Sequence, residues 1–461
     1  MFEITNYSYI RYIHSFEWAI LTFYILLIMG MAFFYQTLQI RKDPIYSFYV
    51  KGVFIKLASS VAFCVIYINY YNGGDTVSYY ETARSLTNLM VHDFGNYLTV
   101  ITQKATLENY FLFDQSTGYP WPYMYYDSQT FFVAKVMVPI LLIAFKSYLV
   151  SSVILSWISF FGMWKLFTTI CRYYPGIETK LSFALLFLPS ALFWGSGILK
   201  DTMTFSAVCW YIYAFERLLA GNNRIRALLI LAIASYFLIS IKPYILTALF
   251  PGSMIWFFHA RISRVQVKFI KYGAIPFIYI MAFVIGFGVL SALGSSLGKF
   301  SVDRMLETAS VTQKDLKQDY YQGSSFDIGD FEPTIAGVAG KAPAAMIVGM
   351  FRPFIWEARN VVMLATGLEN LIFLLLALAI SYRIITGPGR FFKLLFENPL
   401  ILFMFSYSIL FSILVGMSTS NFGALVRFKL PFLSIFVCVL IVIYEFYRKE
   451  SALSKMAQTL R

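Results

Sequence analysis

Two neighbouring charges, Lys200 and Asp201, interrupt an otherwise apolar stretch, FLPSALFWGSGILKDTMTFS (residues 187–206). Ionisable side chains are costly near membrane depth, and those that proteins keep there tend to be functional. A carboxylate can act as a general base, and an ammonium group can stabilise developing negative charge. A structural role is the alternative: the lysine extends along the apolar surface to reach water, and the aspartate caps the following helix.

A second acidic position follows an apolar run, in YNGGDTVSYYETARSL (residues 71–86). The two glycines allow a sharp turn, from which Asp75 emerges. Glu81 and Arg84 then follow three residues apart, on one face of a predicted helix. A carboxylate at this place suits a general base that takes a proton from an attacking hydroxyl group. The competing interpretation makes Asp75 the N-cap of the helix that it precedes.

Cations recur at other connections between the apolar runs. Arg352 and Glu357 lie in FRPFIWEARN (residues 351–360), where aromatic residues are interleaved with charges. Arginine offers forked donors to phosphate, and aromatic faces stack on sugar rings. Lys242 and Arg427 add cations at two further turns. Anchoring at the membrane interface is the alternative for aromatic residues and arginines in such positions.

The composition predicts an all-α polytopic membrane protein. Of 461 residues, 59% are hydrophobic and only 13% are charged, where a soluble protein carries about a quarter. We expect about eleven transmembrane helices, or thirteen if two shorter apolar stretches also cross. The predicted spans are 17–35, 52–71, 147–168, 181–199, 202–219, 226–242, 244–259, 271–294, 359–381, 398–417 and 428–447.

The basic residues predict the orientation of these spans. Alternate connections hold 21 of the 37 basic residues but only six of the 24 acidic ones. Because positive charge favours the cytoplasmic side, the N-terminus is expected outside and the C-terminus in the cytoplasm. The net charge of +13 is then mainly a topology signal that also suits anionic membrane lipids, and it gives no reason to expect nucleic-acid binding.

Residues 1–461 are expected to form a single transmembrane domain with two long outer loops, 72–146 and 295–358. Each loop ends in a moderately apolar stretch, FFVAKVMVPILLIAF or AGKAPAAMIVGMF, which we expect to lie in the interface or to enter the membrane part-way. The polar segment 299–332 is interpreted as a surface lid, an acceptor-binding loop or a linker.

Several classes of protein are disfavoured. The three histidines have no second His or Cys at ligand spacing, and the four cysteines lie in apolar runs, so we expect neither a zinc site nor a His-dependent acyltransferase. There is no GxxxxGK[ST] motif for ATP. Among charges inside the spans, Lys56 and Glu369 stand out. Glu369 is expected to pair with Arg352 or Arg359, with proton transfer as the alternative.

Together, NGGDTVSYY, LPSALFWGSGILKDT, FRPFIWEARN and NFGALVRFKLPF resemble a group of bacterial envelope proteins. These are the multi-spanning polysaccharide polymerases and glycosyltransferases described as Wzy-like, EpsG-like or GT-C-like. The acid of GT-C enzymes usually follows the first span, whereas Asp75 follows the second. The resemblance implies an inner-membrane enzyme that acts at the outer face on undecaprenyl-diphosphate-linked sugars. Its partners would be the lipid-linked oligosaccharide, membrane lipids and envelope-assembly proteins.

The resemblance also implies roles for the residues above. Asp75 would activate the acceptor hydroxyl group, and cations would hold the diphosphate. No cofactor is then required, although Mg²⁺ or Mn²⁺ between Asp75, Asp201 and the diphosphate stays open. Catalytic roles are predicted for Asp75, Lys200 and Asp201, and substrate contacts for Glu81, Arg84, Lys242, Arg352, Glu357 and Arg427.

Two other functions remain open. A transporter or flippase for lipid-linked saccharides would use the same outer cations, but should carry charges deep in several spans. A non-catalytic scaffold of an envelope complex would tolerate alanine at Asp75 and at Lys200.

Overall fold

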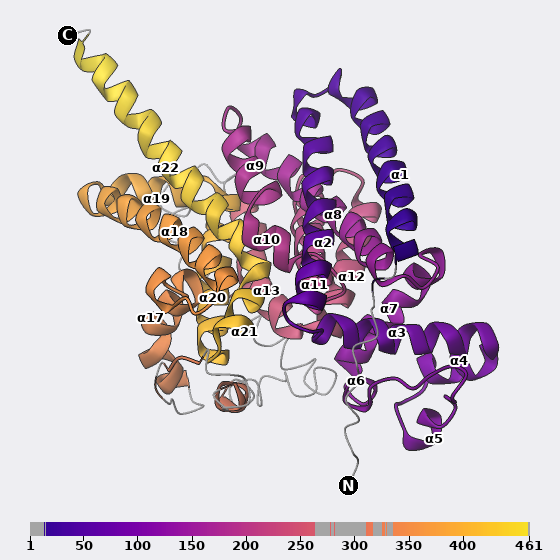
Figure 1. Cartoon of the computed structure of the whole chain (residues 1–461). Helices are drawn as coiled ribbons and strands as arrows, with labels where there is room; N and C mark the ends of the chain where they lie inside the picture. Colours follow the sequence, from indigo (N-terminus) through magenta and orange to yellow (C-terminus); the bar gives the residue numbers. More distant parts are fainter. Residues whose placement is uncertain are drawn as a thin grey trace. The chain divides into compact units, whose positions relative to one another are not determined.

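The computed structural model of the chain is helical (Figure 1). It describes residues 15–262 and 335–459, together with Ile13, Phe277, Met281, 310–316, 325–327 and Gly329. Across these ranges the sole β-type pairing is an isolated bridge between Ser325 and Asn421. The chain forms two compact units. Unit 1 comprises Met1–Thr168, Leu192–Trp210 and Ser240–Lys242, and unit 2 comprises Thr169–Ala191, Tyr211–Ile239 and Pro243–Arg461.

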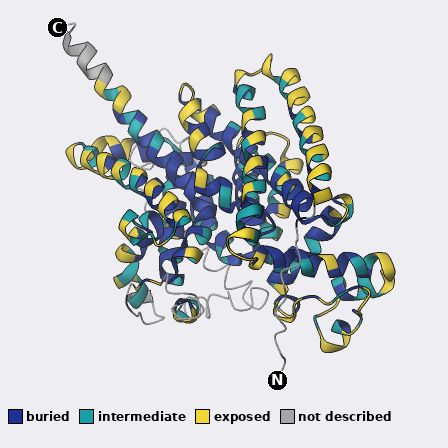
Figure 2. Ribbon diagram, viewed as in Figure 1, coloured by how far each residue is buried: buried dark blue, intermediate teal, exposed yellow. Residues whose placement is uncertain are grey.

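Seven helical segments in the described part of the chain are long and apolar enough to cross a membrane, which confirms the predicted class. They differ in exposure, from largely exposed α1 to largely buried α22 (Figure 2). The segments are α1 (Ser15–Ile40), η1 with α2 (Pro44–Phe48 and Tyr49–Asn69), α8 (Tyr148–Tyr173), α12 (Arg224–Ile241), α18 (Val361–Thr386), α20 (Pro399–Ser418) and α22 (Leu430–Thr459).

Two further 20-residue helices, α11 (Lys200–Leu219) and α13 (Pro243–Ile262), coincide with the predicted spans 202–219 and 244–259. The predicted span 271–294 lies outside the described residues except for Phe277 and Met281. In the polar segment 299–332, the structure describes only 310–316, 325–327 and Gly329.

In unit 1, helices α2 and α8 run antiparallel. Just before α2, the ring of Tyr46 lies 5.2 Å from that of Trp164, near the end of α8. Further along, the hydroxyl groups of Ser60 and Ser156 are 2.9 Å apart. After α2 ends, Thr76 is hydrogen-bonded to Tyr148, the first residue of α8, at 3.1 Å. The end of α2 and the start of α8 lie near this contact, and we call them the Asp75 end of the two helices.

The predicted span 181–199 is wrong as a single helix. The chain forms α9 (Glu178–Leu186), the six-residue α10 (Pro189–Trp194) and a turn over residues 195–199. Proline has no N–H and disfavours helical backbone in the residue before it, so Pro189 separates α9 from α10. Gly197 has φ +80°, and a Cβ there would lie 2.4 Å from the Phe63 ring. Glycine is therefore required at this point of the turn.

The first long loop contains α3 (Asp75–His92), α4 (Phe94–Thr102), α5 (Leu107–Tyr110), α6 (Pro122–Tyr125) and α7 (Ser128–Ile143). Helix α7 is the apolar stretch that we expected in the interface. It packs on α3 and buries half of its residues, including Val133 and Met137. Lys135 donates to the carbonyl of Ile101 at 2.7 Å, and so caps the last turn of α4.

In unit 2, the second short apolar stretch forms α17 (Ile335–Phe351), which packs tightly on α20. A Cβ on Gly416 would lie 2.0 Å from the backbone oxygen of Ala345, and one on Gly349 would lie 2.1 Å from that of Ser412. Each helix thus presents two small residues four apart. This spacing lets backbones approach closely, as in helix pairs within membranes.

Substitution of Gly416 tests this packing. Gly416→Ala places a methyl group against a backbone oxygen, so we expect a loss of about 1–3 kcal/mol in the free energy of unfolding. Gly340→Ala on α17 is the matched control, because no heavy atom lies within 4 Å of its Cβ position. Thermal unfolding of the purified variants in lipid nanodiscs measures the difference, and equal stability of the two variants would contradict the packing.

Candidate functional site

Asp75 is the first residue of α3, and Gly74 is the N-cap. The N-cap role considered for Asp75 is therefore wrong. Gly74 has φ +104°, and a Cβ there would meet the Tyr67 ring at 3.4 Å, so the turn is built on glycine. The Asp75 side chain is exposed, as is Arg84 further along α3. A carboxylate in the first turn interacts favourably with the helix dipole and stays accessible to a substrate.

The loop before α7 brings aromatic residues to the acidic face of α3. The indole N–H of Trp121 donates to Glu81 Oε2 at 2.7 Å. Burial raises the pKa of Tyr123 above its ordinary value; a hydrogen bond with Ser78 opposes this, and the negative charges of Asp75 and Glu81 raise the pKa further. Tyr123 therefore lies within the electrostatic reach of Asp75 and Glu81.

Lys200 begins α11 and reaches the first turn of α7. Its Nζ donates to Thr130 Oγ1 at 2.6 Å and lies 3.7 Å from Asp127 Oδ2. Thr130 in turn donates to Asp127 Oδ2 at 2.7 Å, and Asp127 is the N-cap of α7. Asp127 and Thr130 were not among the predicted site residues, although an Asp-Ser-Gln-Thr sequence before an apolar run is an ordinary N-cap signal. Asp127 follows Tyr123 by four residues. The short segment 121–127 therefore connects the face of α3 near Asp75 to Lys200.

Asp201 faces a different partner from its neighbour. It is fully buried, and its Oδ1 lies 2.5 Å from Nζ of Lys242, which is also buried. This ion pair joins the start of α11 to the residue between α12 and α13. Asp201 is therefore used inside the protein, whereas Lys200 stays partly accessible, with 19% of its side chain exposed.

The turn before Lys200 lies deeper than predicted. Gly195 accepts a hydrogen bond from Lys56 in the middle of α2, and Gly197 N–H donates to Ser156 Oγ at 3.2 Å. Ser156 follows the start of α8 by eight residues, and Phe63 precedes the end of α2 by six. At 1.5 Å per residue, the turn lies about 9 to 12 Å inside the Asp75 end. The turn is therefore buried within the helices, where the side chains of Lys56 and Ser156 satisfy its backbone groups.

In unit 2, Glu369 also binds backbone. Its Oε2 accepts from the N–H and the hydroxyl of Ser190, both at 3.0 Å, at the start of α10. Glu369 therefore bonds Ser190, and not Arg352 or Arg359 as the sequence predicted. Lys429 is fully buried nearby and donates to Asn370 Oδ1 at 2.7 Å.

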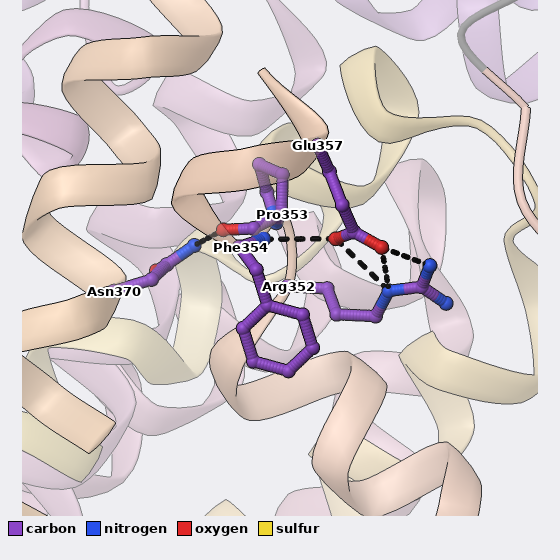
Figure 3. Close-up of polar contacts among 5 residues, drawn as sticks. All are labelled: Arg352, Pro353, Phe354, Glu357 and Asn370. Atoms are coloured by element: carbon purple, nitrogen blue, oxygen red, sulfur yellow. Dashed lines mark hydrogen bonds and ion pairs between the residues drawn. The ribbon is translucent and has the colours of Figure 1, made fainter. Parts of the chain in front are cut away.

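The FRPFIWEARN segment forms a local network (Figure 3). Arg352 makes a forked ion pair with Glu357, and its Nε lies 2.9 Å from Glu357 Oε1. The Arg352 guanidinium lies 4.6 Å and 5.3 Å from the ring centroids of Phe326 and Phe422. Asn370 donates to the carbonyl of Pro353 at 3.0 Å. The contacts that we predicted for a phosphate are thus made within the protein.

The predicted site residues divide between the units. Unit 1 contains Asp75, Glu81, Arg84, Lys200, Asp201 and Lys242, whereas unit 2 contains Arg352, Glu357 and Arg427. Arg427 is half-buried in the last turn of α21 (Phe422–Phe428). Within the described ranges, no three His, Cys, Asp or Glu side chains gather in a way that could hold a metal ion.

Comparisons with known proteins add no family or fold. No family model, curated protein or solved structure matches the chain.

The buried ion pair predicts a large effect of Lys242. Lys242→Met removes the ion-pair partner of the buried Asp201 carboxylate, so we expect a loss of about 3–5 kcal/mol in the free energy of unfolding. The double variant Lys242→Met/Asp201→Asn should recover part of this loss, because the uncompensated charge is removed. Unfolding of the purified proteins in nanodiscs measures both. A single variant as stable as the parent would show that the two side chains do not pair.

Proposed function

We propose that this chain transfers or polymerises undecaprenyl-diphosphate-linked sugars at the outer face of the bacterial inner membrane, for a cell-surface polysaccharide. The observation that carries the proposal is the arrangement in unit 1, where one short segment connects the surroundings of Asp75 to those of Lys200. At one end of this segment, Trp121 donates to Glu81 at 2.7 Å, on the helix that Asp75 begins. At the other end, Asp127 lies 3.7 Å from Lys200. Such a transfer needs a general base and a positive charge that stabilises the leaving group. The exposed carboxylate of Asp75 and the positioned ammonium group of Lys200 can supply them.

The distribution of charge supports the outer location. Arg41, Lys42 and Lys51 lie where α1 meets α2, and the 5.2 Å contact between Tyr46 and Trp164 brings the Lys165 region of α8 to the same level. Positive charge favours the cytoplasm, so the opposite, Asp75 end faces outward.

The depth of the turn before Lys200 suits a lipid diphosphate. Helix α8 has 26 residues and is therefore about 39 Å long, which exceeds the hydrocarbon thickness of about 30 Å. Its ends accordingly extend among the headgroups. A turn about 9 to 12 Å inside the Asp75 end then lies roughly 4 to 8 Å on the hydrocarbon side of the boundary with the lipid phosphates, and the long side chain of Lys200 can extend toward them.

In the proposed reaction, Asp75 removes the proton from an acceptor hydroxyl group. The hydroxyl oxygen attacks the anomeric carbon of the donor sugar and forms the new glycosidic bond. The bond between that carbon and the diphosphate oxygen breaks, and the lipid diphosphate leaves with the electron pair. Lys200 stabilises this leaving group, while the Asp201–Lys242 pair holds the start of α11 in place.

A second candidate is transport of the same lipid-linked saccharides. It is favoured by the break between α10 and α11, because transporters often bind substrates at interrupted helices at membrane depth.

Substitution of Asp75 tests the proposal. Loss of a general base typically costs 10²–10⁴-fold in rate, so Asp75→Asn should lower polymer formation in cells by about 100-fold or more at an unchanged protein level. Asp93→Asn is the matched control, because Asp93 is an exposed N-cap and asparagine caps equally well. Full-length polymer with Asp75→Asn would contradict the proposal. Lipid-linked units that collect at the inner leaflet would favour transport instead.

A further inference from the structure

We infer that Trp121 and Tyr123 form a stacking surface for a sugar ring of the acceptor, beside Glu81 on the helix that Asp75 begins. The inference rests on the proposed function and assigns its acceptor site. Both side chains are largely open, with 43% of Trp121 and 58% of Tyr123 exposed. Their ring centroids lie 6.1 Å apart at an interplanar angle of 48°, so the two rings present one bent aromatic surface.

The Trp121 ring is held in its orientation by α3. Its indole N–H donates to Glu81 Oε2 at 2.7 Å, and its backbone N–H donates to Thr82 Oγ1 at 3.3 Å. An exposed tryptophan that is fixed at two points loses little conformational freedom when a ligand binds. Such preorganisation is typical of a binding surface and is not needed for a side chain that simply contacts lipid.

The local sequence, YPWPYMYY, restricts the backbone as well. Trp121 lies between Pro120 and Pro122, and its φ of −60° and ψ of 125° are extended. Proline fixes φ and disfavours helical backbone in the residue before it. Pro122 then begins α6, where a missing N–H is harmless. The two prolines therefore keep Trp121 extended and Tyr123 in the first turn of α6.

The polar groups around the rings favour a saccharide. The Glu81 carboxylate borders the Trp121 ring through their hydrogen bond, on the helix that Asp75 begins. Sugar hydroxyl groups can donate to such carboxylates while the ring's C–H face stacks on the aromatic surface. An acyl chain would instead desolvate the carboxylates at a high cost. Trp18 is 43% exposed on the spanning helix α1, near exposed Phe16 and Phe23, and is the corresponding lipid-facing case.

Direct binding tests the inference. The probes are soluble oligosaccharides of two to six hexose or N-acetylhexosamine units, and the sample is the full chain in nanodiscs. Saturation-transfer NMR should detect binding of at least one probe to the parent protein. Trp121→Ala should weaken that binding by about tenfold or more, and Trp121→Phe should restore part of it, because a phenyl ring keeps an aromatic face on which the sugar can stack. Trp18→Ala should leave it unchanged.

Three results would overturn the inference. The first is that no probe binds the parent protein, and the second is that Trp121→Ala binds as well as the parent. The third is that brominated lipids quench the fluorescence of Trp121 as strongly as that of Trp18. The contribution of each tryptophan to the fluorescence is obtained from the Trp121→Phe and Trp18→Phe variants. Asp75→Asn separates this test from that of catalysis: the asparagine side chain can still hydrogen-bond with a sugar hydroxyl group but cannot take its proton, so the variant should keep saccharide binding and lose polymer formation. Binding together with full activity of Asp75→Asn would refute the transfer chemistry and leave the sugar surface in place.

Discussion

A helix that breaks at membrane depth exposes backbone groups that no water can satisfy, and this constraint explains two of the charges inside the predicted spans, Lys56 and Glu369. Helix α10 has only six residues. At its start, Glu369 accepts two hydrogen bonds from Ser190, and just after its end, Lys56 donates to the carbonyl of Gly195. The negative charge thus lies at the N-terminus and the positive charge at the C-terminus, as the helix dipole favours. Each side chain satisfies groups that would otherwise cost several kcal/mol in hydrocarbon.

The position of Lys200 and Asp201 follows from this break. Ser156 and Phe63 hold the turn at Gly197, so α11 begins at a defined place. The first two residues of α11 then point to different partners, Lys200 to the N-cap region of α7 and Asp201 to Lys242. Because α7 packs on α3, whose first residue is Asp75, the lysine is tied through packed helices to the carboxylate that we propose as the base.

Apolar run length predicted the helical membrane class and many of the helices, because hydrocarbon imposes a simple requirement on length and hydropathy. It did not predict that 181–199 is broken, since α9 and α10 are apolar on both sides of Pro189. It also placed the Lys200–Asp201 turn at the surface, because the side chains that satisfy the turn, Lys56 and Ser156, are distant in sequence. Asp75 and Lys200 could be singled out from residue type and neighbours. Their connection through Asp127 and Tyr123 depends on tertiary contacts, which no single segment reveals.

The most direct test of this account is a transfer reaction with the purified chain. Nanodiscs that contain the protein would receive an undecaprenyl-diphosphate-linked saccharide isolated from the source cells, and the release of undecaprenyl diphosphate would be followed by mass spectrometry. Glycosyl transfer predicts that lipid diphosphate appears together with a lengthened saccharide, and that Lys200→Met slows both to the same extent. If the saccharide crosses the bilayer of proteoliposomes unchanged, with no lipid diphosphate released, the chain moves its substrate and does not transform it, and the proposed chemistry is wrong.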